Sequence, residues 1–278
     1  MKRVTRLLIT LTALIFPFQI SLAAIQSSDE PWEKVSVRAG GFLTALNTSV
    51  RIGLTEGSGI DIDLEGALGI ESSMWALRAD ALYRFSKNRR HRLDLSYVGY
   101  FRSATRTTSE DIPIGDDTIV SGTEVETTYN LQIIKLLYSW SFFMDDRIDL
   151  GLGGGLYLMP ISLKITPQSG PVAPKKQDLT APLPVLDLHM DFAITPKWYF
   201  KQKYSFFYLA IGNFRGGIID TELDIEYRFW KYAGVGLGYN SFRLGIQADN
   251  PDEGSFFSLN GKIETTYNGL LLYAKFYF

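Results

Sequence analysis

The sequence predicts a transmembrane, antiparallel, up-and-down β-barrel of about ten strands, and three observations predict it. Apolar and polar residues alternate with a period of two over many segments. Short connections between these segments alternate with longer polar ones, and aromatic residues are concentrated at the segment ends. Beyond the first 24 residues there is no apolar run of the roughly 18 residues or more that a spanning helix needs. Hydrophobicity spread over short alternations is typical of strands with one apolar face.

The first residues have the features of an export signal. A basic start, MKRVTR, precedes an apolar run from Leu7 to Ile20, and SLA at 21–23 has the small-x-small pattern of a signal-peptidase site. A transmembrane helix is the alternative, but this run falls short of the about 20 residues that it requires. We therefore expect residues 1–23 to be a cleaved signal peptide and residues 24–278 to form one barrel domain.

The composition excludes several classes of protein. The chain has no cysteine, which rules out disulfides, a thiol nucleophile and thiolate metal sites. The formal net charge is −2 and the charges are dispersed, so we expect no nucleic-acid partner. The glycine-rich letters GLGGGL at 151–156 lie within an alternating segment and not before a helix, so they do not indicate a phosphate-binding loop. We expect no cofactor.

The period-two pattern places the strands. In 75–85, for example, Trp75, Leu77 and Tyr83 share one face, whereas Arg78 and Arg84 share the other. Such a segment is long enough for the about 9–11 residues that cross a bilayer at a tilt. Strands are expected at 35–53, 73–86, 91–105, 122–143, 147–163, 181–194, 198–213, 218–230, 233–246 and 255–278.

Two features leave the strand count open. Twelve strands would follow if 59–68 crossed separately, or if TTYNGL were a turn and not a bulge at Asn268-Gly269. In 124–143 the apolar parity changes near Ile133-Ile134, which indicates a further bulge. Ten is the preferred count because it is even and puts every short turn on one side.

The connections favour a membrane barrel over a soluble sandwich, whose strands also alternate. Aromatic residues at strand ends are typical of the girdles of a membrane barrel, and so is a marked difference in length between the connections on its two sides. Short connections are expected at 86–90, 144–146, 195–197 and 230–232; longer ones are expected at 106–121, 165–180 and 247–254, with the shorter 214–217 as the exception.

The last residues add a family resemblance. GLLLYAKFYF, with Leu270, Leu272, Phe276 and Phe278 on one face, resembles the closing strand of Gram-negative outer-membrane β-barrels. The resemblance implies location in the cell outer membrane, contact with its lipids, and recognition by the barrel-assembly machinery after escort by periplasmic chaperones. The stretches GIDIDLEGALGI and LYRFSKNRRHRLDLSY further resemble a group of uncharacterised bacterial barrel proteins. That likeness implies no activity, and we expect a monomer.

The inward-facing parity carries charges of both signs. An Arg or Lys facing lipid at mid-bilayer costs about 2–4 kcal/mol, so this segregation is meaningful. The charges either fill a narrow barrel with ion pairs or line a passage for ions or small solutes. The residues expected inside are Arg38, Arg78, Asp80, Arg84, Arg92, Asp94, Arg102, Lys135, Asp149, Asp187, Asp191, Lys201, Lys203, Glu222, Asp224, Glu226, Arg228, Lys262 and Lys275.

The letters DLHMD form the strongest catalytic candidate. Asp187, His189 and Asp191 alternate on one strand and so share a face. A tight turn at 195–197 would set Asp191 beside Lys201 and His189 beside Lys203. Carboxylates that orient a histidine suit acid–base or hydrolytic chemistry, but a buried ladder of ion pairs explains the same pattern. The His-x-Ser element of outer-membrane phospholipases and the rim histidine of omptin-like proteases are missing from the sequence.

Two acidic groups suggest cation binding. Glu222, Asp224 and Glu226 would lie beside Gly234, Gly236 and Gly238, and small residues next to an acidic stripe indicate a cation-preferring passage. Arginines from the opposite wall would fill this space in the alternative interpretation.

The letters DIDLE could bind Ca²⁺ at an outer loop through Asp61, Asp63 and Glu65, although alternation on one face explains them equally well.

Three functions remain open, in this order of preference. The first is a structural or surface-interaction barrel with a largely filled lumen. The second is a narrow porin-like channel for cations or small solutes, and the third is an outer-membrane hydrolase that uses His189.

Overall fold

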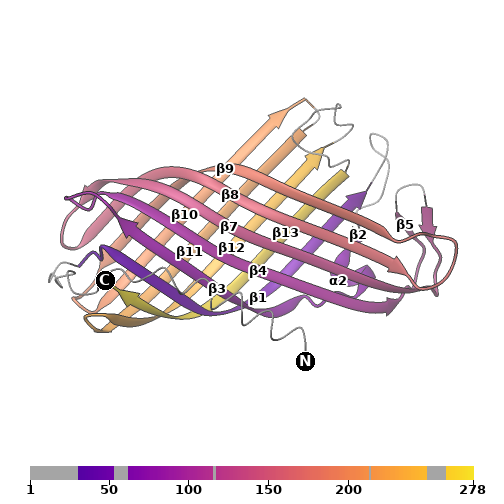
Figure 1. The fold of residues 1–278 in the computed structure, drawn as a ribbon, viewed down its shortest axis with the longest axis horizontal. Helices are drawn as coiled ribbons and strands as arrows, with labels where there is room; N and C mark the ends of the chain where they lie inside the picture. The colour runs from indigo at the N-terminus through magenta and orange to yellow at the C-terminus, as the bar shows by residue number, and fades with distance from the viewer. Residues whose placement is uncertain (1–30, 53–61, 115–116, 213, 249–260) are drawn as a thin grey trace, which may run out of the picture.

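Ten long antiparallel strands form one closed barrel in the computed structural model, which describes residues 31–52, 62–114, 117–212, 214–248 and 261–278. Each long strand pairs with its neighbour in sequence, and β13 pairs with β1 to close the barrel (Figure 1). The strands are β1 (Val35–Ile52), β3 (Ser73–Arg84), β4 (His91–Thr107), β7 (Glu124–Met144), β8 (Ile148–Pro167), β9 (Lys175–Ala193), β10 (Trp198–Ile211), β11 (Phe214–Trp230), β12 (Ala233–Ala248) and β13 (Gly261–Tyr277). The predicted fold class is confirmed, whereas the predicted signal peptide lies outside the described residues.

The twelve-strand alternative is wrong for the segments that the structure describes. β2 (Ile62–Asp63) only adds a short pairing to β1 and leads into helix α2 (Leu64–Leu68), which Asp63 caps. β13 runs through Asn268 without a turn or a change of register. Within the described ranges, no helix is long and apolar enough to cross a membrane.

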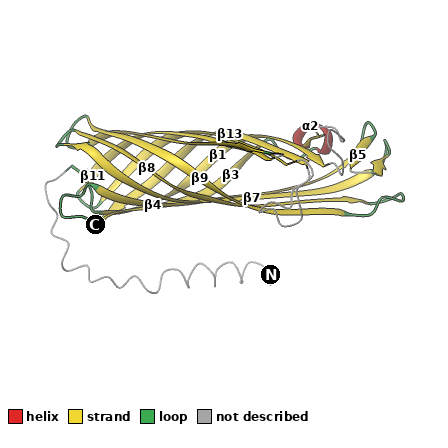
Figure 2. Cartoon of the chain, turned by 90° about the horizontal axis from the view of Figure 1, so that it is seen from above, coloured by secondary structure: helices red, strands yellow, loops and turns green. Residues whose placement is uncertain are grey.

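The barrel has two unlike ends, which we call the turn end and the loop end. Four short connections lie at the turn end, together with residues 31–34 and Phe278. The loop end carries the longer connections, α2, and a hairpin of β5 (Ile112–Ile114) and β6 (Asp117–Ile119) (Figure 2). The predicted short exception also lies at this end, but at 212–213 and not at 214–217, which belong to β11. The predicted asymmetry of the connections is confirmed, although β8 and β9 extend beyond their predicted limits and shorten their loop to 168–174.

The environment of the strands inverts between the two ends, as β7 shows. Toward the turn end, Ile134, Leu136, Tyr138, Trp140 and Phe142 face outward and Lys135 faces inward. This apolar outer stretch of about nine residues suits a tilted strand in a bilayer. Toward the loop end, the same outward parity is polar, and the inward one is apolar. The outward residues there are Glu124, Glu126, Thr128, Asn130 and Gln132, and the inward ones include Val125, Tyr129, Leu131 and Ile133.

This inversion explains two irregularities in the sequence pattern. The bulge predicted at Ile133-Ile134 is wrong, because β7 pairs with β4 in unbroken register there and its register shift with β8 falls at Ser141/Phe143. The parity change at Asn268-Gly269 likewise occurs within a continuous strand. Both positions are where the apolar face changes from the outside of the barrel to the inside.

Toward the loop end the barrel flattens into two facing sheets. β9 pairs with β10 only as far as Leu186↔Phe206, and β3 pairs with β4 only as far as Arg78↔Val98. Beyond these pairs, β4, β7, β8 and β9 form one sheet and the other six long strands form the second, and the two cross in Figure 1. Aromatic side chains pack between the sheets: the Tyr100 and Tyr267 rings lie 5.4 Å apart, and Phe242 stacks on Tyr267 at 4.8 Å.

Candidate functional site: the charged lumen

The inward-facing charges gather in the turn-end half, where they form what we call the charged lumen. Every residue in the predicted set that lies there is buried or partly buried and points inward. Two members of that set differ. Arg102 lies in the loop-end half, where it donates hydrogen bonds to Glu65 of α2 and to the Thr48 hydroxyl. Lys262 was wrongly placed inside, since it faces outward on β13 and pairs with Glu264 at 3.1 Å.

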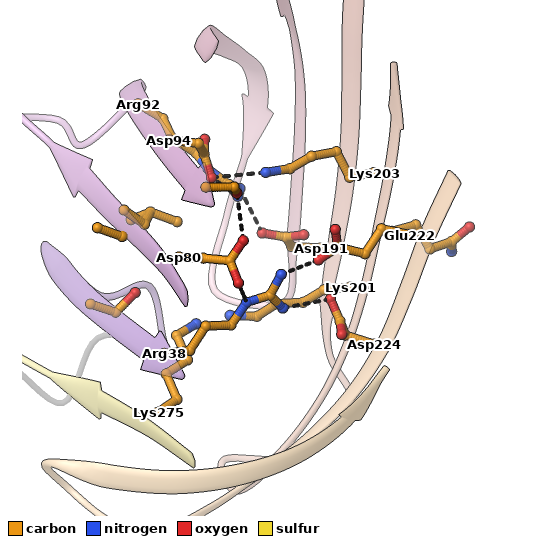
Figure 3. Close-up of a pocket in the computed structure, with 15 residues that line it drawn as sticks. Arg38, Asp80, Arg92, Asp94, Asp191, Lys201, Lys203, Glu222, Asp224 and Lys275 are labelled. Carbon is orange, nitrogen blue, oxygen red and sulfur yellow. Dashed lines mark hydrogen bonds and ion pairs between the residues drawn. The ribbon is translucent and has the colours of Figure 1, made fainter. Parts of the chain in front are cut away.

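Arg38 of β1 is the hub of the charged lumen (Figure 3). Its guanidinium donates to Asp80 at 2.7 Å, to Asp224 at 2.9 Å and to Glu222, so that one cation joins β1 to β3 and to β11 across the barrel. Arg78 adds bonds to Glu222 and to Asp80. Five donors in a planar fork make arginine suited to bridging several carboxylates.

A second cluster crosses the barrel nearby. Arg92 of β4 holds Asp94 at 2.7 Å and reaches Asp191 on β9 at 3.0 Å, and Lys203 donates to Asp94 at 2.9 Å. The predicted register of Asp191 with Lys201 and His189 with Lys203 is confirmed. Asp191 and Lys203 nevertheless form their ion pairs across the lumen, with Arg92 and Asp94 of β4, and not with each other's strand, because side chains of a closed barrel meet at its centre.

Residues 31–34 close the turn end, which the sequence pattern did not reveal. Glu33 enters the mouth of the barrel and accepts from Lys275 at 2.6 Å and from Lys201 at 3.1 Å, and it lies 3.5 Å from Arg228. Trp32 is buried beside it and donates from Nε1 to the Asp145 carbonyl at 2.5 Å. These contacts tie the segment before β1 to four other parts of the chain.

The three cations also control the ionisation of Glu33. Burial alone would raise the pKa of its carboxyl, but the charges of Lys201, Lys275 and Arg228 outweigh burial and hold the pKa well below its ordinary value. Glu33 is therefore a carboxylate at neutral pH and keeps its ion pairs.

The acidic stripe of β11 is occupied by protein groups. Glu222 and Asp224 bind Arg38, whereas Glu226 binds Lys275 and accepts from the Tyr277 hydroxyl at 2.7 Å. The glycine neighbours were predicted one pair out of step: Asp224 lies opposite Gly238 and Glu226 opposite Gly236, so that Glu222 lies opposite Asn240. The space that a Cβ would need at Gly238 is filled by the Asp224 carboxylate, and at Gly236 by the Tyr273 ring.

The sequence pattern also missed Asp220, which lies on the inward face of the same strand. Lys135 donates to it at 2.5 Å, Tyr157 at 2.8 Å and the Asn240 amide at 2.6 Å. Its alternation with Glu222 was the available signal.

His189 lies in the wall of the charged lumen with none of its side chain exposed. Its Nε2 is 3.5 Å from Asp149 of β8, and its ring covers Gly151, where a Cβ would have no room. The predicted partners bond elsewhere: Asp187 accepts from the Ser205 hydroxyl at 2.7 Å, and Asp191 pairs with Arg92. The strand neighbours of His189 therefore do not orient its imidazole.

The structure gives the residues of the predicted calcium site other contacts. Asp63 accepts from the backbone N–H groups of Glu65 and Gly66 at 3.1 Å, and Glu65 bonds Arg102 and the Thr48 N–H. Asp61 lies outside the described residues. Within the described ranges, no group of three His, Asp or Glu side chains is placed to hold a metal ion.

A small cavity of about 50 Å³ lies among the charges around Arg38, Arg92 and Lys203. It has room for a few water molecules between ionised groups. Ion pairs cross the lumen on several sides of it, as Figure 3 shows for Asp80, Arg38 and Asp224. The charged lumen is thus mostly filled by its own side chains.

The comparisons with known proteins define the class by fold. No protein-family model matches the chain, and no curated protein matches its sequence. The outer membrane protease OmpT from Escherichia coli is similar in structure, with a TM-score of 0.55 and 11% identity over 87% of this chain and 97% of that one. Ail of Yersinia pestis (TM-score 0.34, 8% identity, 85% and 98% covered) and the NalP translocator domain of Neisseria meningitidis (0.41, 8%, 85% and 88%) also match. The chain has the fold of an outer-membrane β-barrel.

Proposed function

We propose that this protein is a sealed barrel of the Gram-negative outer membrane that holds a rigid β-sandwich outside the lipid, in a structural or surface-interaction role. Export by a cleaved signal peptide and insertion by the barrel-assembly machinery fit the features of both chain ends. The apolar outer belt of the turn-end half would face lipid, with the short turns in the periplasm. The polar outside of the loop-end half would then stand in water as a monomeric platform.

One observation carries this proposal: the lumen is closed by two independent layers. In the turn-end half, the ion pairs of Arg38, Arg92 and Glu33 bridge the barrel from wall to wall. In the loop-end half, apolar side chains fill the space between the sheets, and the Tyr129 hydroxyl meets Thr265 across them at 3.0 Å. The hairpin adds Ile112, Ile114 and Ile119 to that core.

Contacts with other molecules would be made by the outer surface of the loop end, because the hairpin and α2 are packed into the barrel on their inner side. Their inner faces are committed to the barrel, since Leu64 and Leu68 of α2 are fully buried in the same core. The strands below them carry polar residues on their outward face, such as Glu124, Glu126 and Thr128 of β7, which suits a platform for binding better than a passage.

Single-channel conductance of the refolded mature protein in a planar bilayer tests the proposal. We expect silence from the wild type and also from a variant that lacks residues 24–34, because the apolar layer alone still blocks ions. Heat-modifiable mobility on gels would show that each sample is folded. Steady cation-selective steps that shrink in an E222Q/D224N/E226Q variant would contradict the proposal and favour the channel.

The hydrolase alternative has less support from the geometry. A substrate would have to reach His189 through a filled lumen, and the imidazole lies beside Asp149 in the wall. We expect H189A to fold and to leave any surface-binding activity unchanged. A hydrolytic activity of the wild type that is lost in folded H189A would overturn this ranking.

A further inference from the structure

The outer surface of the loop-end half differs in charge between its two sheets. On the sheet of β4, β7, β8 and β9, outward acidic and basic residues are mixed, and Lys176 pairs with Asp178 at 2.5 Å. On the long strands of the other sheet, outward basic residues predominate over the carboxylate of Glu264. They are Arg51 on β1, Arg215 on β11, Arg243 on β12 and Lys262 on β13. The second sheet therefore presents the more positive surface.

Two arginines of this group have no protein partner in the part of the chain that the structure describes. Arg215 and Arg243 are exposed, and within those ranges no ion pair or hydrogen bond joins either guanidinium to another residue. Lys262, by contrast, is paired with Glu264 at 3.1 Å. Because the planar guanidinium forms parallel N–H bonds with the oxygens of an anion such as phosphate, both side chains are available to bind one.

A bare stretch of the barrel wall lies between the two arginines. Gly217 of β11 pairs with Gly245 of β12, and we call this pair the glycine floor. Arg215 precedes the first glycine by two residues and Arg243 precedes the second by two, so that on antiparallel strands they flank the floor from opposite sides. A Cβ at Gly245 would have no atom within 4 Å, and one at Gly217 would lie 3.4 Å from the Tyr208 ring.

The floor is within reach of both guanidinium groups. Two residues of a strand span about 7 Å, a distance that an extended arginine side chain covers. Alternation places Arg215, Arg243 and both glycines on the outward face of the wall. An anion on the glycine floor could therefore be held from both sides without displacing a protein side chain.

The glycine floor lies at the loop-side rim of the apolar belt. Arg243 pairs with Ile219, and Ile219 pairs with Phe206, so these three residues form one outward row across the strands. Ile219 is 60% exposed and Phe206 is 51% exposed. On the other side of the floor, Arg215 pairs with the polar Gln247. The site thus has an apolar surface on its belt side and a polar one on its loop side.

We propose that Arg215 and Arg243 hold the phosphate group of an anionic lipid of the surrounding bilayer over the glycine floor, with its acyl chains against Ile219 and Phe206. The positive charge complements a phosphate, and the adjoining apolar row favours a lipid over a soluble anion. Phosphate headgroups lie at the rim of the hydrocarbon, where an outward arginine is tolerated at a cost of only about 0–1 kcal/mol. This inference rests on the proposed placement of the apolar belt in the outer membrane and adds the class of lipid that the barrel binds.

Lipid titration followed by native mass spectrometry tests the site. The mature protein would be refolded in a nonionic detergent and titrated with phosphatidic acid, and separately with phosphatidylcholine of the same acyl chains. We expect phosphatidic acid to bind about tenfold more tightly, and R215Q/R243Q to lose about tenfold or more in affinity for it, since a bond to a charged group commonly contributes that factor. Equal binding of the two lipids by the wild type would overturn the proposal, and so would wild-type affinity in R215Q/R243Q.

A matched control separates this site from a general effect of charge. K164Q/K176Q removes the same charge from the other sheet, where Lys164 and Lys176 are exposed, outward and paired with each other. We expect this variant to bind phosphatidic acid as the wild type does. A loss equal to that of R215Q/R243Q would overturn the proposal, because any exposed cation would then serve.

Gly245 offers a second variant, which keeps every charge. Because a Cβ there meets no atom within 4 Å, we expect G245F to fold, with its ring covering the glycine floor. Its affinity for phosphatidic acid should fall about as far as that of R215Q/R243Q. Unchanged affinity would overturn the proposal, since the headgroup would then lie elsewhere.

The source of the phosphate and the membrane placement are tested separately. If inorganic phosphate displaced phosphatidic acid at an equal concentration, the ligand would be a soluble anion and the lipid would be wrong. Insertion of the wild type into vesicles, followed by its heat-modifiable mobility, tests the proposed function. Inserted protein without a preference for phosphatidic acid would contradict this inference alone. Protein that stays outside the vesicles would contradict the proposed function and this inference with it.

Discussion

The two halves of the barrel are built from the same strands with opposite polarity. In the turn-end half, charges lie inside and apolar side chains lie outside, as for Lys275 and Leu272 of β13. In the loop-end half, Tyr267 lies inside and Thr266 outside, as in a soluble protein. The same hydrogen-bonded strands can therefore face lipid in one half and water in the other. Alternation is a property of the backbone, and only the choice of side chains differs between the two environments.

The largest effect on stability is expected from truncating a buried side chain in the core of the loop-end half. Phe242 is fully buried and stacks on Tyr267, so F242A should lower the free energy of unfolding by about 3–5 kcal/mol, the usual cost of removing a buried phenyl ring. Hydrogen exchange should show the loss in the loop-end parts of β12 and β13. If protection falls equally in the turn-end half, the two halves do not differ as described.

Removing the hub of the charged lumen should cost nearly as much, for a different reason. R38M keeps the bulk but removes the salt-bridge partner of the buried Asp224 carboxylate, and breaking a buried ion pair in this way typically costs about 3–5 kcal/mol. Asp224 has Arg38 as its salt-bridge partner, so R38M/D224N should recover part of the loss. Chemical unfolding in vesicles measures both variants. Strictly additive losses would argue against a coupled pair.

Arginine substitutions at two outward positions of β13 should distinguish the part of the strand that faces lipid from the part that faces water. Leu272 and Thr266 share the outward face, but we expect only Leu272 to meet lipid. L272R should therefore destabilise the barrel by about 2–4 kcal/mol, and T266R should change its stability by less than about 1 kcal/mol. Equal losses would place both positions in the same environment.

The smallest effect is expected at the turn-end closure and depends on pH. The lowered pKa of Glu33 means that its carboxylate stabilises the fold fully above about pH 4.5, its ordinary value, and that this gain is lost as pH falls through the lowered pKa. At pH 7, E33Q should be less stable than the wild type by about 1.5–3 kcal/mol, the usual contribution of a hydrogen bond to a charged group. Acid titration of both proteins should bring their stabilities together; a gap that widens in acid would contradict the assignment.

The sequence sufficed for the fold because alternation and connection lengths are local features. It predicted ten strands, the inward charges of β11 and the register of Asp191 with Lys201. It failed at Ile133-Ile134 and Asn268-Gly269, where a change of solvent and a bulge produce the same shift of parity. The available signal was that the outward residues turn polar as the inward ones turn apolar.

The ion-pair partners across the lumen could not be predicted from the sequence, for another reason. Which strands face each other depends on the shear and flattening of the closed barrel, which no single segment encodes. Arg38 with Asp224 and Arg92 with Asp191 are pairs of this kind. Glu33 was missed because it lies before the first alternating segment and acts only once Lys275 and Lys201 are assembled around it.

One measurement tests the inversion most directly: the accessibility of nitroxides along the outward face of β13. Labels would be attached to the single-cysteine variants T266C, N268C, L270C and L272C, reconstituted in vesicles, and probed with oxygen and with a water-soluble nickel complex. We predict that labels at 270 and 272 respond to oxygen, as in lipid, and that labels at 266 and 268 respond to nickel, as in water. Lipid-like responses at all four positions would contradict the account, because the strand would then lie in the membrane along its whole length.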